Sequence, residues 1–246
     1  MKTMILKYSR SPARVNWLWN ALLLSLCVTQ VARAQESQIP AENHERWYQV
    51  EMIVFARSEN PAQQESWPHN IQLSYPADVT ALKPAETGDN SGFSLLKTSE
   101  RQLNPQVSSI AKSGSYSLLF HQAWRQLISA QTSSILINGG KIFNNHYELE
   151  GSIDLSVAQY LKLQTNLWLT QFTPVNSVND LGANWPELPP LPHTDITPAD
   201  QAPDYLVKRI VKLKQERSIR SQEIHYIDHP LLGIIIKIVP YSPAAQ

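Results

Sequence analysis

The chain has 246 residues, with 21 basic side chains, 21 acidic side chains and a single cysteine, Cys27. One cysteine excludes an internal disulfide framework, and the balanced charge differs from the strongly positive charge of general nucleic-acid-binding proteins. The chain is long enough to bury an ordinary hydrophobic core.

Residues 1–34 have the pattern of a cleaved secretory signal peptide. They contain no acidic residue, and an apolar run from Trp17 to Val31 precedes the small residues Ala32 and Ala34. The five basic residues of this segment are Lys2, Lys7, Arg10, Arg14 and Arg33. Cleavage after Ala34 removes the only thiol and leaves 212 residues with a formal charge of −5. We therefore expect a periplasmic protein of a Gram-negative envelope, with no transmembrane segment after cleavage and no nucleic-acid partner.

The first predicted strand follows a polar leader, residues 35–45. Trp47–Phe55 is rich in β-branched and aromatic residues and becomes apolar on both faces, which is typical of a central strand. Residues 57–99 then contain four prolines and the turn-forming patch Gly88–Gly92. This composition predicts a long surface loop.

A helix and a second strand are predicted next. Leu103, Val107 and Ile110 have helical spacing, and Pro105 requires the helix to start near that position. The following segment, Ser115–Arg125, reads as a strand.

The clearest periodicity lies between Gly151 and Phe172. Apolar and polar residues alternate in two successive runs, which predicts an antiparallel hairpin with one buried face and one solvated face. The solvated side of the second run carries Tyr160, Lys162, Gln164, Asn166 and Trp168.

The last third of the chain begins with a Pro-rich connection, residues 176–204. A basic strand is predicted at Tyr205–Arg220 and an apolar strand at Ile234–Val239. The pattern as a whole predicts an α+β fold, mainly antiparallel sheet with one or two helices and long Pro-rich surface loops. We expect residues 46–246 to form a single domain.

The solvated row of the hairpin is a candidate sugar-binding surface. An indole can stack on a sugar ring, while Lys162, Gln164 and Asn166 can hydrogen-bond its hydroxyl groups. The alternative interpretation places Trp168 beneath one of the long loops, where it fills a second core.

The basic strand is a second candidate surface. Its exposed cations could bind carboxylates such as those of cell-wall stem peptides, with arginine as the stronger contributor. They could equally protect a solvated edge strand. The residues are Lys208, Lys212, Lys214, Arg217 and Arg220.

A cluster of titratable groups precedes the last strand, and it comprises His225, Tyr226, Asp228, His229 and Pro230. We interpret it as a structural corner in which Asp228 caps a tight turn, because Pro230 restricts the backbone before it. A ligand-binding corner and a metal or catalytic site are the alternatives. The chain lacks the common hydrolase motifs and the glycine-rich phosphate loop. We therefore expect no catalytic residues, no metal and no cofactor.

Several blocks of the sequence together resemble the CsiV family of peptidoglycan-binding periplasmic proteins. They are Arg46–Phe55, His121–Gln126, Glu148–Gly151 leading to Tyr160–Leu163, and Arg217–Gly233 with its His-Tyr-Ile-Asp-His-Pro run. The resemblance extends over residues 46–57, 118–126, 147–172 and 210–239.

This resemblance implies a non-enzymatic exported factor that binds peptidoglycan and supports cell-wall synthesis and cell shape. It implies as a partner an outer-membrane lipoprotein that activates a bifunctional penicillin-binding protein. Two other functions stay open from the residues alone. One is a cell-envelope adaptor that binds only proteins, and the other is a metal-dependent hydrolase centred on His225, Asp228 and His229.

Overall fold

The computed structural model describes residues 45–58, 68–83, 93–175, 185–193 and 205–243, which all belong to one compact unit. The predicted signal peptide lies outside the described residues, as do nearly all of the leader and parts of the two long loops. Within the described part, none of the helices has the length and apolar character needed to cross a bilayer.

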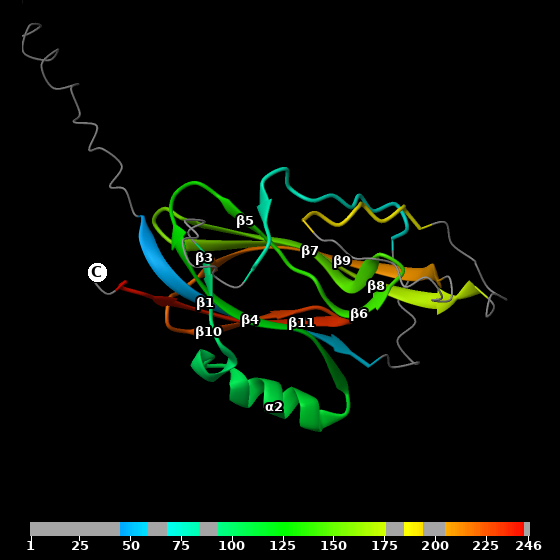
Figure 1. Cartoon of the computed structure of the whole chain (residues 1–246), viewed down its shortest axis with the longest axis horizontal. Coiled ribbons are helices and arrows are strands. Elements are labelled where there is room, and N and C mark those ends of the chain that lie inside the picture. The colour runs from blue at the N-terminus through cyan, green and yellow to red at the C-terminus, as the bar shows by residue number, and fades with distance from the viewer. Residues whose placement is uncertain (1–44, 59–67, 84–92, 176–184, 194–204, 244–246) are drawn as a thin grey trace, which may run out of the picture. The chain divides into compact units, whose positions relative to one another are not determined.

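Two β-sheets lie face to face (Figure 1). The strand order of sheet A is β10 (Ile224–Asp228), β11 (Leu232–Pro240), β1 (Arg46–Arg57), β4 (Tyr116–Ile128) and β3 (Phe93–Leu95). The strand order of sheet B is β2 (Val79–Thr80), β5 (Ser133–Leu136), β7 (His146–Val157), β8 (Leu161–Pro174) and β9 (Tyr205–Ile219), and β6 (Gly139–Phe143) also pairs with β7. Among the described strands, only the short β2–β5 pair is parallel.

The strand predicted at Trp47–Phe55 is β1, and it lies in the centre of sheet A between β11 and β4. Met52 and Val54 face the space between the sheets, whereas Ile53 and Phe55 face the opposite side. All four side chains are buried. The strand is apolar on both faces because each face is covered by other parts of the chain.

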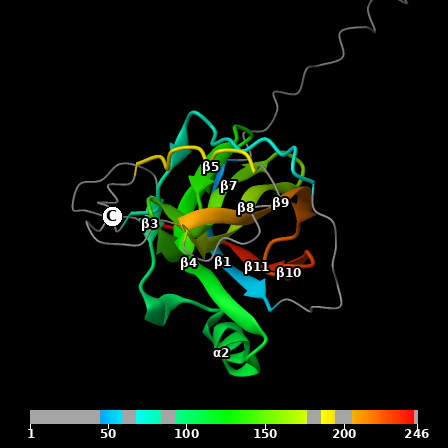
Figure 2. The ribbon, with the colours of Figure 1, turned by 90° about the vertical axis from the view of Figure 1, so that its right-hand side faces the viewer.

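A single α-helix, α2 (Asn104–Ser113), covers the outer face of sheet A in the described part of the chain (Figures 1 and 2). Pro105 occupies its first turn, where the missing N–H group has no partner to lose. The helix ends at Gly114, which adopts the left-handed conformation with φ 67°. The predicted helical residues contact Ile53 and Phe55, and they are Leu103, Val107 and Ile110.

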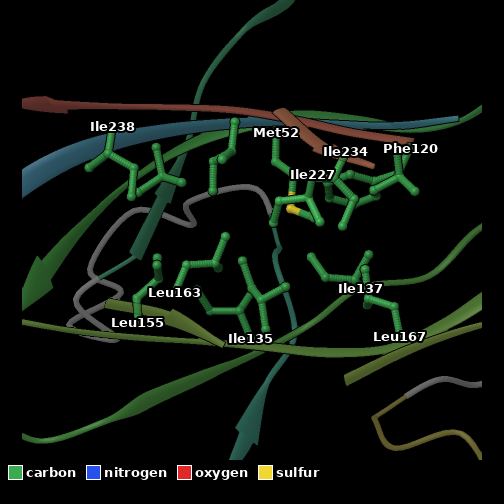
Figure 3. Close-up of a cluster of buried hydrophobic side chains, with 14 of the residues drawn as sticks. Met52, Phe120, Ile135, Ile137, Leu155, Leu163, Leu167, Ile227, Ile234 and Ile238 are labelled. Carbon is green, nitrogen blue, oxygen red and sulfur yellow. The ribbon is translucent and has the colours of Figure 1, made fainter. Parts of the chain in front are cut away.

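The main core fills the space between the sheets (Figure 3). Sheet A contributes Met52, Phe120, Ile227, Ile234 and Ile238, among others. The side of sheet B contributes Ile135, Ile137, Leu155, Leu163 and Leu167. Full burial of one such side chain stabilises the fold by about 1.5–3 kcal/mol. This core explains how the domain holds together without cysteines.

The predicted hairpin is formed by β7 and β8, which pair antiparallel with Leu155 opposite Leu163. Its alternation is confirmed, since Leu161 and Leu163 are buried whereas Lys162 and Gln164 are exposed. The mainly antiparallel architecture and the helix are also confirmed.

Two features of the fold differ from the predicted pattern. The strands form two packed sheets, whereas the sequence indicated only that sheet predominates. In addition, the segment predicted as a long loop at 57–99 contains β2, β3 and a single 3-10 turn at Thr98–Glu100. Such short strands have too few residues to show a period in the sequence.

Candidate functional site

The polar row predicted on the hairpin lies on the outer face of sheet B. Lys162 and Gln164 of β8 both contact Glu216 of β9 there. The nitrogen Nζ of Lys162 lies 3.4 Å from Glu216 Oε1, and Nε2 of Gln164 donates to Oε2 at 3.0 Å. These exposed pairs add little stability, but they neutralise part of the charge of the row.

Two other members of the candidate surface bind residues 71–76, which cross this face and which we call the crossing segment. Asn166 Nδ2 donates to the backbone oxygen of Ser74 at 2.9 Å, and Lys212 Nζ donates to the backbone oxygen of Gln72. Burial lowers the pKa of the Lys212 ammonium group, and the nearby charge of Lys214 lowers it further. Both side chains are therefore engaged in packing the protein itself.

Trp168 is fully buried, so it offers no stacking surface to a ligand. Its side chain points away from the main core, as predicted, but Leu188 and Ile210 cover it, and Tyr75 packs beside it with ring centroids 5.0 Å apart. The sugar-stacking role predicted for Trp168 is thus corrected. The alternative interpretation describes the structure, because Trp168 forms the centre of a second core.

A buried carboxylate belongs to the same layer as Trp168. Glu150 accepts a hydrogen bond from the backbone N–H group of Tyr147 at 2.8 Å and from the hydroxyl group of Tyr75 at 3.3 Å, and His146 Nδ1 lies 3.2 Å away. Burial raises the pKa of the Tyr75 hydroxyl group, and the charge of Glu150 raises it further. Tyr75 therefore remains a neutral donor that fixes the crossing segment to sheet B.

A hollow of about 500 Å³ lies beside this crossing segment. Its lining includes Asp154, Gln164, Asn166, Lys214 and Glu216. These side chains offer carboxylate, amide and ammonium groups to a polar ligand.

Arg217 lies on β9, the last strand of sheet B, and Arg220 directly follows that strand. Both side chains are exposed. Within the described residues, neither guanidinium group has a hydrogen-bonding or ion-pair partner. Both guanidinium groups therefore remain available to an anionic ligand.

The predicted corner is the hairpin of β10 and β11, but Asp228 does not cap its turn. The turn is closed instead by the backbone N–H group of His229, which donates to the oxygen of Leu232 at 3.0 Å. His225 contacts the preceding turn, with Nε2 lying 3.1 Å from the backbone nitrogen of Arg220. The prediction that the Asp228 carboxylate caps this turn was wrong, because that carboxylate contacts Arg57 and Tyr226.

The possible metal ligands of this corner do not converge. His225 and Asp228 occupy opposite faces of β10, because successive side chains of a strand alternate. Among the described residues, no three His, Cys, Asp or Glu side chains are placed to hold a metal ion.

Tyr226 and Asp228 instead meet Arg57 on the outer face of sheet A, and we call these three residues the Arg57 cluster. Arg57 Nη2 donates to the Tyr226 oxygen and to Asp228 Oδ1, and the Tyr226 hydroxyl group donates to the same Oδ1 at 2.7 Å. Burial raises the pKa of Tyr226, and its hydrogen bond to Asp228 adds to this effect against the opposing influence of Arg57. Tyr226 is therefore a neutral hydroxyl donor at ordinary pH.

Sequence reasoning missed Arg57, which lies 171 positions before Asp228. It ends β1, and the pairing of β1 with β11 brings it to β10. Arg57 also lines a second hollow, of about 430 Å³, together with Leu118, Lys141 and Glu148.

One protein-family model matches this chain, over residues 19–241, and it is described as "Peptidoglycan-binding protein, CsiV". The match includes every block on which the sequence resemblance is based and confirms that resemblance. Neither the curated proteins nor the solved structures give a match.

Proposed function

The chain belongs to the CsiV family, and from this premise we propose that it binds peptidoglycan in the periplasm and catalyses no reaction. The observation that carries the proposal is the family match, which extends over almost the whole chain. The signal-peptide pattern of residues 1–34 supports the location.

The exposed edge of sheet B is the surface that we assign to the peptide part of peptidoglycan. Arg217 and Arg220 supply two unpaired guanidinium groups, and Lys214 extends the positive charge along β9. Stem peptides carry carboxylates, which guanidinium groups bind through paired hydrogen bonds. The hollow lined by Gln164 and Asn166 lies on the neighbouring outer face and can receive peptide amides.

The cellular role that we propose is support of cell-wall synthesis. The family resemblance supports a partnership with an outer-membrane lipoprotein that activates a bifunctional penicillin-binding protein. In such an assembly this protein contributes wall binding, and the synthase contributes the chemistry.

The test is sedimentation of the purified protein with isolated sacculi. We expect the protein to pellet with sacculi at low ionic strength and to be partly released by salt, because the Debye length falls from about 10 Å at 0.1 M to about 3 Å at 1 M. Muropeptides released before and after incubation should be identical. Absence of pelleting at low salt would overturn the binding proposal, and new muropeptides would overturn its non-enzymatic part.

A protein-interaction adaptor is the rival function. Cross-linking in cells that captures an envelope protein, together with no sacculus binding in the pure system, would favour the adaptor. Capture of a synthase activator together with sacculus binding supports the proposed role.

A further inference from the structure

Three aromatic rings lie together on the outer face of sheet A, next to the Arg57 cluster. Phe55 is buried between Tyr116 and Tyr226. Tyr226 lies nearly parallel to Phe55, with ring centroids 6.5 Å apart and an interplanar angle of 8°. Tyr116 meets Phe55 edge-on at 5.1 Å. The two outer rings remain exposed, Tyr116 by 39% and Tyr226 by 43%.

The orientation of Tyr226 is fixed before any ligand binds. Its ring packs on Phe55, and its hydroxyl group is held by Arg57 and Asp228. The backbone of this region is fixed as well, because Arg57 N–H donates to the oxygen of Leu231 at 3.0 Å. An aromatic side chain that is already immobile loses little conformational entropy on binding. This arrangement favours a ligand-binding role for Tyr226 over that of an ordinary exposed tyrosine.

The polar groups beside the rings are Arg57 and Asp228, whose opposite charges neutralise each other. The side chain of Asp228 is 63% exposed and that of Arg57 is 30% exposed. Within the described residues, Asp228 Oδ2 has no hydrogen-bonding partner, so it can accept a hydrogen bond from a ligand. A balanced pair suits a neutral ligand rich in hydroxyl and amide groups better than it suits a carboxylate.

From this geometry we propose that Tyr226, Tyr116, Arg57 and Asp228 form a glycan-binding site for the sugar backbone of peptidoglycan. A sugar ring has an apolar C–H face that packs on an aromatic ring, and its hydroxyl and acetamido groups lie at the rim, where Arg57 and Asp228 bind them. The hollow that Arg57 lines with Leu118 and Lys141 provides space for a ring substituent. This inference rests on the proposed function, and it assigns the glycan to sheet A and the peptide to the edge of sheet B.

The experiment measures binding of the protein, purified in the form that the cell exports, to two separated probes. One probe is glycan strands from which an amidase has removed the peptides, and the other is the free stem peptides. We expect the wild-type protein to bind glycan strands with little dependence on salt. Tyr226→Ala should weaken this binding about tenfold, which corresponds to about 1.4 kcal/mol, because the sugar ring loses the aromatic surface on which it packs. Asp228→Asn should weaken glycan binding less than loss of the ring does.

The matched control is Val175→Ala, since Val175 is an apolar side chain that is 41% exposed but directly follows β8, outside the site. Circular dichroism and a urea midpoint show whether each variant is folded. If Tyr226→Ala does not fold, Tyr116→Ala and the response of the wild-type protein to each probe test the inference in its place.

Wild-type protein that binds sacculi and stem peptides but not glycan strands overturns this inference and leaves the proposed function intact. Glycan binding that Tyr226→Ala and Tyr116→Ala leave unchanged overturns it as well. Failure of the wild-type protein to bind sacculi counts against the proposed function itself.

Discussion

His121 Nε2 lies 2.8 Å from Glu51 Oε1, in a contact that is buried between sheet A and the start of α2. The same carboxylate accepts the backbone N–H groups of Gln102 at 2.6 Å and Leu103 at 2.9 Å. Glu51 thereby connects the central strand to the two residues that lead into α2, where N–H groups lack helical partners. A negative charge at this end also interacts favourably with the helix dipole.

Replacement of Glu51 by glutamine should therefore destabilise the domain. The amide keeps the shape of the carboxylate, but its NH₂ group cannot accept a hydrogen bond, so one of the three donors loses its partner. Hydrogen bonds to charged groups contribute about 1.5–3 kcal/mol, and we expect a loss of about 2 kcal/mol in the free energy of unfolding, measured by urea denaturation. Glu223→Gln is the control, because Glu223 is exposed in the turn before β10. Equal stability of both variants would contradict the role of Glu51.

Acid should remove the contribution of Glu51. Burial alone would raise the pKa of this carboxyl group, but the hydrogen bonds from His121, Gln102 and Leu103 outweigh burial and hold the pKa below its ordinary value of 4.5. A lowered folded-state pKa means that this stability is fully present above the ordinary pKa and is lost as the pH falls through the folded-state value. The difference in unfolding free energy between wild type and Glu51→Gln should thus be constant from neutral pH to about pH 5 and shrink below pH 4. A difference that grows in acid would contradict this assignment.

The sequence predicted those elements whose patterns are local. Leu103, Val107 and Ile110 lie within one helix, and the alternation of β7 and β8 repeats over neighbouring residues, so a periodic reading identifies both. The alternation of β8 also predicted that the side chain of Trp168 points away from the main core. Its burial did not follow from this pattern, because the covering residues Tyr75 and Leu188 come from segments without periodicity.

The candidate site was predictable only in part for the same reason. Arg217 and Arg220 are exposed at the end of a strand whose basic pattern is visible in the sequence. Arg57 and Asp228 meet only because β1, β11 and β10 pair side by side, which no short motif encodes. Tyr226 was therefore interpreted as part of a corner, and its contact with Phe55 became visible only in the fold.

Replacement by alanine should be tolerated less well at Gly151 than at Gly114. Gly151 has φ 132°, and a Cβ atom there would lie 2.1 Å from the backbone oxygen of Asn166 on β8. Gly114 also has a positive φ, but a Cβ atom would meet nothing within 4 Å. We expect Gly151→Ala to cost about 3 kcal/mol or more and Gly114→Ala about 1 kcal/mol, measured by urea denaturation. Similar costs at both positions would show that β7 and β8 separate easily.

Substitution of Trp168 should affect stability and leave ligand binding intact. Trp168→Ala removes the centre of the second core and should cost about 3–5 kcal/mol. Trp168→Phe keeps an apolar ring beside Tyr75, so this variant should remain folded and pellet with sacculi like the wild-type protein. Loss of sacculus binding by a folded Trp168→Phe variant would restore the indole as a ligand contact and contradict its purely structural role.

Neutralising the two free arginines should weaken sacculus binding through charge. Arg217→Gln and Arg220→Gln each remove an exposed guanidinium group that has no partner in the described residues, so the fold should be unaffected within about 0.5 kcal/mol. The double variant should bind sacculi at least about tenfold more weakly at low salt, because each charge-assisted hydrogen bond to a carboxylate contributes about 1 kcal/mol or more.

Salt provides the decisive comparison for these arginines. If they bind stem-peptide carboxylates, the wild-type protein should lose affinity with rising ionic strength, while the double variant should respond weakly because its charges are already absent. Lys112→Gln is the matched control, since Lys112 is exposed on α2. This helix packs on sheet A, whereas β9 belongs to sheet B. A Lys112→Gln effect as large as that of the arginines would mean that overall charge, and not this edge of sheet B, attracts the protein to the wall. A double variant that retains wild-type affinity and salt dependence would remove the arginines from the binding surface altogether.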